Sequence, residues 1–481
     1  MSGVLTLLSN FLDRLMKTSH FVLAAALALS ACSNPNTSQA QDGLAEPTRR
    51  APESQGDLQA SFAPVVQVSA PAVVNISART LVRQRDPFFE MFGRSGGPTR
   101  SRVAQSVGSG VIVRSDGIVV TNNHVIEGAQ QILVTLNDRR EFPAEIVLQD
   151  QRSDLAILRL DTGGERLPVL ALDDSEDQQI GDLVLAIGNP FGIGQTVTSG
   201  IISALNRTDG TEDAASFIQT DAAINQGNSG GALVDMDGDL IGINSMILSP
   251  SGASAGVGFA IPASMIRRVV DSATGGETSV QRAWLGVGAA RMTANEATRI
   301  GLDRPRGVIV ESVYRGGPAA SAGVRQGDVI TAVGGHEIDD VASLNFRVGV
   351  IRPGDEAQLT VFRDGREQTL TARVAAPPGD PNPTAVVLGG RNPFSGAAVA
   401  DLTPAFADSI GVSPTQRGVI VAHLSGRSYA AAAGFQRGDI IRAVNGQDVG
   451  SVAQLQQVLN QPTRGWQATI IRNGQEVQGR W

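Results

Sequence analysis

An internal repeat in the C-terminal half is the feature that most limits how this chain can fold. The segment Ala319–Ile330 (AASAGVRQGDVI) recurs as Ala430–Ile441 (AAAAGFQRGDII), about 110 residues later. Each copy follows an apolar stretch of strand-like composition, Gly307–Val310 or Gly418–Val421. Solenoid units recur about every 20–50 residues, so this longer period predicts two copies of one small domain.

The order of features in each copy, a helix, a glycine, a Gly-Asp pair and a strand, resembles bacterial PDZ domains. Such domains bind extended peptides by strand addition, and the N–H groups of a glycine-containing loop hold the carboxylate of the peptide. In the second copy, Phe394–Ala397 (FSGA) is the nearest match to this loop. The first copy matches better, and its expected peptide-binding residues are Trp284, Leu285, Gly286 and Val287. Trp284 could instead be a core packing residue.

A serine among glycines stands out in the N-terminal half, in Ile224–Leu233 (INQGNSGGAL). Glycine allows backbone to approach closely, so two N–H groups beside Ser229 could converge on a developing oxyanion. A glycine-rich turn between two strands would have the same composition. The segment therefore indicates catalysis only in combination with other residues.

His124 and Asp154 provide that combination. His124 follows the strand-like Gly117–Val120, and Asp154 precedes the apolar Leu155–Leu158. Serine is a weak nucleophile, so it needs a base, and a carboxylate can orient a histidine that serves as this base. The chain order His–Asp–Ser is that of chymotrypsin-type double barrels, not of subtilisins or α/β-hydrolases. Each residue alone could be structural, but the three together predict a proteolytic site.

Several motifs resemble the HtrA/Deg (Do) family of bacterial envelope serine proteases: TNNHV (121–125), SDLAIL (153–158), QTDAAINQGNSGGAL (219–233), LIGINS (240–245) and GVGFAIP (256–262). The resemblance implies a mainly β chain, with a chymotrypsin-like double β-barrel followed by two PDZ domains. It also implies an ATP-independent serine endopeptidase that degrades misfolded or damaged proteins. In this family His124 would be the general base, Asp154 its orienting acid and Ser229 the nucleophile. The N–H groups of Gly227 and Ser229 would form the oxyanion hole.

The resemblance leaves the biological role and the assembly open. The expected partners are unfolded polypeptides and peptide C-termini, and the expected assembly is a homotrimer or a multiple of trimers. One alternative is a chaperone-like peptide-binding protein in which proteolysis is secondary. Another is a regulatory protease that cuts one signalling substrate, although relatives of that kind typically carry a single PDZ domain.

The substrate pocket is expected to be apolar. Ala223 stands six positions before the nucleophile, where trypsin-like relatives carry an acid, so no charge awaits a basic side chain. We therefore expect cleavage after Val, Ala or Ile. The residues expected to contact substrate in the protease domain are Ala223, Ile224, Asn225, Ile243 and Ile247.

Composition narrows the partners further. The net charge of −8 gives no basic surface for nucleic acid. His20, His336 and His423 are scattered without spaced partner ligands, so neither a metal site nor a cofactor is expected. The high glycine count, 55, and the low aromatic content, 4%, favour β-rich units with many tight turns.

The N-terminus reads as a targeting segment. Phe21–Ala31 has the length of a signal-peptide apolar region and is too short to span a bilayer. It runs into Leu29–Cys32 (LSAC), which resembles the lipobox of bacterial lipoproteins and makes Cys32 the expected lipidation site. Ordinary signal cleavage is the alternative. The expected location is the periplasm, with Ser33 favouring a lipid anchor in the outer membrane, and translation could begin at Met16 instead of Met1.

The expected boundaries follow from these features. They are a signal peptide at 1–31, a flexible linker at 32–61, the protease domain at 62–272 ending in a helix from Ala263 to Ser272, the first PDZ domain at 281–376, a Pro-rich linker at 377–390 and the second PDZ domain at 391–481. Within the protease domain, the apolar cluster Asp86–Gly93 is expected either in a regulatory loop and trimer contact or packed locally on its own barrel.

Overall fold

The computed structural model describes residues 61–85, 99–190, 194–207, 216–225, 227–247 and 256–481. The expected signal peptide, Cys32, the N-terminal linker up to residue 60 and the cluster Asp86–Gly93 lie outside these ranges. Within them, no helix combines the length and the apolar character needed to cross a bilayer.

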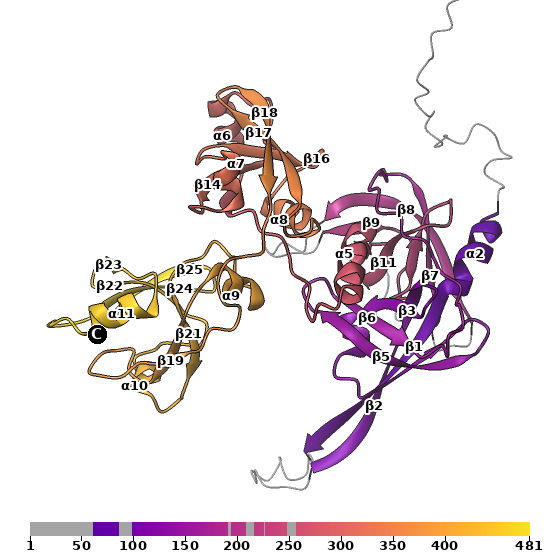
Figure 1. Ribbon diagram of the computed structural model, residues 1–481, viewed down its shortest axis with the longest axis horizontal. Coiled ribbons are helices and arrows are strands. Elements are labelled where there is room, and N and C mark those ends of the chain that lie inside the picture. Colours follow the sequence, from indigo (N-terminus) through magenta and orange to yellow (C-terminus); the bar gives the residue numbers. More distant parts are fainter. Residues whose placement is uncertain (1–60, 86–98, 191–193, 208–215, 226, 248–255) are drawn as a thin grey trace, which may run out of the picture. The chain divides into compact units, whose positions relative to one another are not determined.

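The first barrel is built from the N-terminal strands (Figure 1). A short helix α2 (Ala63–Ser69) and a 3-10 turn η2 (Ala70–Ala72) precede it. The six strands close in the order β1-β2-β3-β6-β5-β4, and a short helix α4 (Asn123–Ile126) leaves the end of β3. The strands are β1 (Val73–Arg85), β2 (Thr99–Arg114), β3 (Ile118–Asn122), β4 (Gln131–Thr135), β5 (Glu141–Asp150) and β6 (Leu155–Leu160).

The second barrel has the same number of strands and closes in the order β10-β11-β12-β9-β8-β7. Helix α5 (Ala263–Thr274) follows it directly after Pro262, so the expected helix forms and extends to Thr274. The strands are β7 (Leu183–Gly188), β8 (Thr196–Arg207), β9 (Phe217–Thr220), β10 (Ala232–Val234), β11 (Leu240–Ile247) and β12 (Gly258–Pro262). The predicted double barrel is confirmed.

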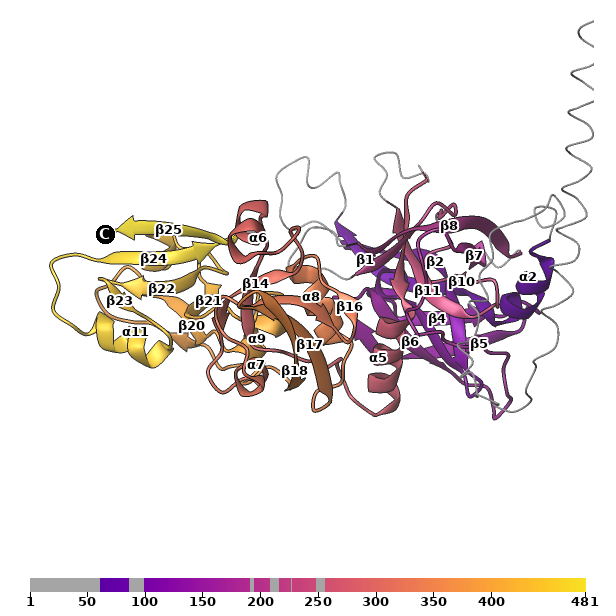
Figure 2. The same ribbon diagram turned by 90° about the horizontal axis from the view of Figure 1, so that it is seen from above.

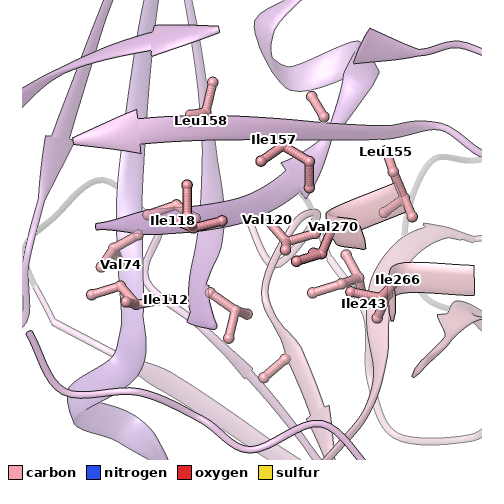
Figure 3. Packing of buried hydrophobic residues seen from close by; sticks show 14 of the residues in the cluster. Val74, Ile112, Ile118, Val120, Leu155, Ile157, Leu158, Ile243, Ile266 and Val270 are labelled. Carbon is pink, nitrogen blue, oxygen red and sulfur yellow. The ribbon is translucent and has the colours of Figure 1, made fainter. Parts of the chain in front are cut away.

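The two barrels and α5 share one hydrophobic core. Figure 3 shows Val120 of β3 near Ile243 of β11 and Ile266 of α5, with Ile118 farther along β3 in the same cluster. All four side chains are buried, and burying an aliphatic side chain of this size contributes about 1.5–3 kcal/mol. The candidate catalytic residues lie after β3, before β6 and in the turn before β10. This shared packing fixes these three places relative to one another.

The first repeat domain (281–376) is a sheet in the order β13-β14-β15-β17-β18, with β16 paired to β15. Capping boxes at Thr293 and Asp340 begin α6 and α8, because each side chain accepts a backbone N–H of the first helical turn. The elements are β13 (Val287–Arg291), α6 (Ala294–Ile300), β14 (Val308–Val313), α7 (Pro318–Ala322), β15 (Val329–Val333), β16 (His336–Glu337), α8 (Val341–Gly349), β17 (Glu356–Arg363) and β18 (Arg366–Arg373).

The second repeat domain (386–481) follows the order β19-β20-β21-β22-β24-β25, with β23 paired to β22. Helix α11 lies beside β20 (Figure 2). The elements are β19 (Val386–Val387), β20 (Ala397–Asp401), α9 (Pro404–Ser409), β21 (Val419–Leu424), α10 (Tyr429–Ala432), β22 (Ile440–Val444), β23 (Gln447–Asp448), α11 (Val452–Leu459), β24 (Gln467–Arg472) and β25 (Gln475–Arg480). The expected linker 377–390 is therefore too long, because Val386 and Val387 already pair with β20.

An ion pair explains why the Gly-Asp pair recurs in both copies. The buried carboxylate of Asp328 accepts two hydrogen bonds from Arg363, each 2.6 Å, and one from the N–H of Arg325. Asp439 does the same with Arg472, at 2.7 and 2.6 Å, and with the N–H of Gln436. The carboxylate thus joins the turn after the helix to β17, the strand that pairs with β15, or to β24, the strand that pairs with β22.

Candidate active site

His124 sits on the short helix α4, directly after the buried strand β3. Its Nδ1 lies 2.7 Å from Oδ2 of Asp154, and its backbone N–H donates to Oδ1 of the same carboxylate at 3.0 Å. With one ring nitrogen held by the carboxylate, the other is the nitrogen left to exchange protons. The side chain is 47% exposed, so a substrate can reach it.

Asp154 occupies the turn between β5 and β6, with a left-handed backbone (φ 53°). Aspartate tolerates this conformation better than most residues, although it still carries strain. The amide of Asn122 and the N–H of Asn123 both donate to its carbonyl at 3.0 Å, which holds the turn against the end of β3. These two hydrogen bonds thus fix the Asp154 carboxylate beside His124, which follows β3.

Ser229 lies in the turn before β10, and its neighbouring glycines are required by close packing. A Cβ on Gly230 would lie 2.1 Å from the carbonyl oxygen of Ser109, and a Cβ on Gly231 would lie 2.3 Å from that of Ile187. Gly230 also has a φ of 83°, which favours glycine. Any other residue at either position would displace the serine.

Ser245, which the sequence did not reveal, connects two of the three predicted residues, Asp154 and Ser229. Its hydroxyl donates to Oδ2 of Asp154 at 3.0 Å, and its carbonyl accepts the hydroxyl of Ser229 at 3.1 Å. Among the hydrogen bonds of the described residues, Ser229 Oγ is bonded to the carbonyl of Ser245 and not to His124. The motif LIGINS contains Ser245, but a serine on a buried strand gives no signal of its own.

A second residue that sequence reasoning missed, Ser109, anchors the turn before Ser229. Its buried hydroxyl donates to the carbonyl of Gly227 at 2.6 Å and accepts the N–H of Asn189 at 2.8 Å. Its own N–H donates to the carbonyl of Ser229 at 2.8 Å. Gly227 has a φ of 104°, and a Cβ there would lie 2.5 Å from Pro190. Strand β2 therefore holds both ends of this turn.

The five expected pocket residues differ in their surroundings. Ala223 is half-buried and its carbonyl accepts the hydroxyl of Thr198 at 2.9 Å, while Asn225 is exposed. Ile224 is buried, so close to Gly258 that a Cβ there would lie 2.8 Å from its Cδ1. Ile247 ends β11, and its side chain is outside the description.

Ile243 is a correction to the expected pocket. Its side chain is fully buried in the core shared by the two barrels (Figure 3), where it has no surface to offer a substrate. Strand β11 is buried on both faces over its described side chains, so its sequence has no apolar–polar alternation from which the pocket side could be chosen.

Three family models match the chain. A trypsin-like peptidase domain matches residues 108–243, and PDZ domains match residues 284–374 and 422–465. A probable periplasmic serine endoprotease DegP-like of Halomonas elongata is 38% identical, over 83% of this chain and 88% of its own length. One of the same description from Hahella chejuensis is 40% identical, over 86% of this chain and 91% of its own length.

The chain belongs to the HtrA/Deg family of serine endoproteases. A solved structure of a variant of the HtrA-type protease AlgW with a decapeptide agrees with this: it is 43% identical, covers 66% of this chain and 98% of its own, and has a TM-score of 0.50. The protein is thus a serine endopeptidase with two PDZ domains, and the repeat domains are these PDZ domains. No group of His, Cys, Asp or Glu in its described residues is suited to hold a metal ion.

The predicted loop of the first PDZ domain of this HtrA protease contains a packed residue, Trp284, and a glycine, Gly286. Trp284 is buried and packs edge-on against Tyr314, with ring centroids 4.9 Å apart. Gly286 has a φ of 80°, and a Cβ there would lie 3.1 Å from the Trp284 ring. Leu285 and Val287 line a cavity together with side chains of α8. Trp284 therefore packs against the loop as a core residue would, and its contact with a peptide stays a prediction.

Proposed function

We propose that this HtrA protease is an ATP-independent endopeptidase of the periplasm that cuts misfolded or damaged proteins. His124 is its general base, Asp154 the carboxylate that orients the base, and Ser229 the nucleophile. The observation that carries this assignment is the double contact of His124 with one carboxylate, through Nδ1 at 2.7 Å and through its own N–H at 3.0 Å.

The chemistry then follows from these groups. Ser229 Oγ attacks the carbonyl carbon of the peptide bond while its proton passes to Nε2 of His124. Asp154 stabilises the imidazolium, which gives the proton to the leaving amine as the C–N bond breaks. Water, deprotonated by the same histidine, hydrolyses the acyl-enzyme and restores the serine hydroxyl.

The oxyanion of the tetrahedral intermediate would be held by the N–H groups of Gly227 and Ser229. The hydrogen bonds from Ser109 to the carbonyls of these two residues support this proposal, because they fix the backbone on either side of Asn228. Preorganised donors of this kind contribute about 2.7–4 kcal/mol each to catalysis.

Recognition would come from two places. Ala223, which is uncharged and half-buried, favours small or medium aliphatic residues before the cut bond. The first PDZ domain would hold exposed C-termini of substrates or activating peptides at the loop from Trp284 to Val287. Periplasmic relatives support the proposed location, and we further propose that Cys32 is lipidated and tethers the protein to the outer membrane.

The test of this function is a digestion of native and unfolded casein-type substrates, with the cut sites identified by mass spectrometry. We expect faster cleavage of the unfolded substrate and cuts after Val, Ala or Ile. Cuts mainly after Lys or Arg would contradict the apolar pocket. For the tether, Cys32→Ala should move the protein from the membrane fraction to the soluble periplasmic fraction. Identical soluble fractionation of both proteins would refute lipidation.

A further inference from the structure

The two PDZ domains differ at the strand edge where a peptide would add. β13 and β20 are equivalent: each follows the glycine loop, each pairs with the next strand, and each has a bulge after its second residue. In the described part of the chain, β13 pairs with β14 alone, whereas β20 is paired on both edges. The extra partner of β20 is the chain's own β19.

β19 has the direction and position of a PDZ ligand. It runs antiparallel to β20, with Val386 opposite Val399 and Val387 opposite Ala398. The next residue, Leu388, donates its N–H to the carbonyl of Ala397 at 2.8 Å. Its own carbonyl accepts the N–H of Gly396, also at 2.8 Å. In a bound peptide the terminal carboxylate accepts N–H groups of this loop, so the Leu388 carbonyl stands in for a carboxylate oxygen.

The side chains of the segment are least exposed at its end: Val386 is 39% exposed, whereas Leu388 is buried. Leu388 is 3% exposed and belongs to the core cluster that contains Phe394 of the loop and Leu455 of α11. Val387, its neighbour, is 69% exposed. After Leu388 the chain turns away through Gly389 and Gly390, and the latter has a φ of 92°.

The first PDZ domain shows what the same site is like without a strand paired to its edge. The N–H of Gly286 has no hydrogen-bond acceptor among the described residues, whereas its counterpart Gly396 is bonded to Leu388. Val341 and Leu344, the α8 counterparts of Val452 and Leu455 on α11, line a cavity with Leu285 and Val287, and residues 413–416 of the second PDZ domain line the same cavity. The chain enters this domain differently, because the carbonyl of Gln281 is bound by Arg268 of α5.

We propose that Val386–Leu388 is an internal ligand that fills the peptide groove of the second PDZ domain. Free C-terminal peptides then bind at the first PDZ domain, and the second groove opens only when β19 is displaced. Tethering favours the internal segment, since its effective concentration is on the order of millimolar for a short linker. The burial of Leu388 assigns the groove a ligand class: peptides that end in an aliphatic residue such as Leu.

This inference rests on the proposed role of PDZ grooves as peptide sites, so its test separates the two. Full-length protein carrying Ser229→Ala is titrated by calorimetry with the free-acid peptide TAVVL, the chain's own residues 384–388. We expect Leu388→Asp to add one binding site that the parent lacks, because a buried carboxylate expels the segment. The matched control Val387→Asp changes an exposed side chain of the same strand and should add none.

Each outcome bears on one of the two claims. An affinity for the second groove that is the same with and without Leu388→Asp overturns the inference, since displacement should increase it at least about tenfold. Peptide binding that Gly286→Val leaves at full affinity in the parent also overturns it, because the second groove is then open. Failure of the parent to bind any C-terminal peptide contradicts the proposed function, while a site gained by Leu388→Asp would still support the internal ligand.

Hydrogen exchange on the parent covers the case in which Leu388→Asp fails to fold. The amides of Leu388 and Gly396 should be protected without peptide. They should stay equally protected at a peptide concentration that saturates the first PDZ domain. Faster exchange over 386–390 together with slower exchange over 396–401 would show a peptide replacing β19 and would overturn the inference.

Discussion

The two PDZ domains are built alike but present their binding edges differently. Both contain the buried Asp–Arg pair, the glycine loop and the bulged strand beside a helix. In the first domain the loop N–H of Gly286 is open, while in the second that of Gly396 is bonded to Leu388. A duplicated fold therefore does not give a duplicated site. The segment that leads into each domain decides whether its groove is open.

The largest expected effect is the loss of cleavage when the nucleophile is removed. Peptide binding to the two grooves can then be compared without hydrolysis of the peptide. Ser229→Ala should lower kcat by about 10⁵–10⁶, because only substrate binding and oxyanion stabilisation remain. Binding of C-terminal peptides by the first PDZ domain should be unchanged in calorimetry. Appreciable proteolysis by the purified variant would refute the assignment of the nucleophile.

The shared ion pair should make the two domains respond equally. Asp328→Ala and Asp439→Ala each leave a partly buried guanidinium, that of Arg363 or Arg472, without its carboxylate. Loss of hydrogen bonds to a charged group destabilises by about 1.5–3 kcal/mol. Hydrogen exchange of each domain measures the loss locally. A large loss of stability in one domain and none in the other would show that the two ion pairs are not equivalent.

The internal ligand should make the second domain sensitive to a segment outside its glycine loop. Leu388→Ala should destabilise this domain by about 2–5 kcal/mol, because it removes a buried side chain from the core. The exposed neighbour changed in Val387→Ser should alter stability by no more than about 0.5 kcal/mol. Local denaturant dependence of hydrogen exchange distinguishes the two. Equal effects would mean that β19 is not packed into the groove.

The smallest expected effect concerns the loop of the first domain. Gly286→Val places a branched side chain at a φ of 80° beside the ring of Trp284, and should weaken peptide binding at least about tenfold. Cleavage of a short substrate should remain near the parent rate. Fluorescence titration with free-acid and C-terminally amidated peptides checks the mechanism. Equal affinities for the two peptides in the parent would contradict carboxylate recognition.

Most of the fold could be predicted from the sequence, because the signals were local. The spacing of the repeat indicated the two similar domains, the glycine-rich composition favoured β-rich units, and the family resemblance implied the double barrel. The glycines around Ser229 were recognisable because that turn passes close to backbone of other strands, at Gly230 and Gly231. The contact of His124 with Asp154 agrees with the hypothesis drawn from their order in the chain.

What sequence reasoning missed depends on contacts distant in the chain. Ser109 and Ser245 are ordinary strand residues, and only the closed barrels bring them to the turn of Gly227 and to Asp154. Val386–Leu388 follows a Pro-rich stretch and therefore resembled a linker. Nothing in its local sequence reveals that it pairs with the edge of β20. Each of these residues acts through a contact with a residue distant in the chain, and only the folded structure shows that contact.

The most direct test of the central claim, that Ser229 is the nucleophile activated by His124, is covalent labelling with a fluorophosphonate. Such a reagent phosphonylates an activated serine and releases fluoride. Mass spectrometry of the digested protein should find one adduct, on the peptide that contains Ser229, and should find almost none in His124→Ala. An adduct on a different serine, or undiminished labelling of Ser229 without His124, would contradict the assignment.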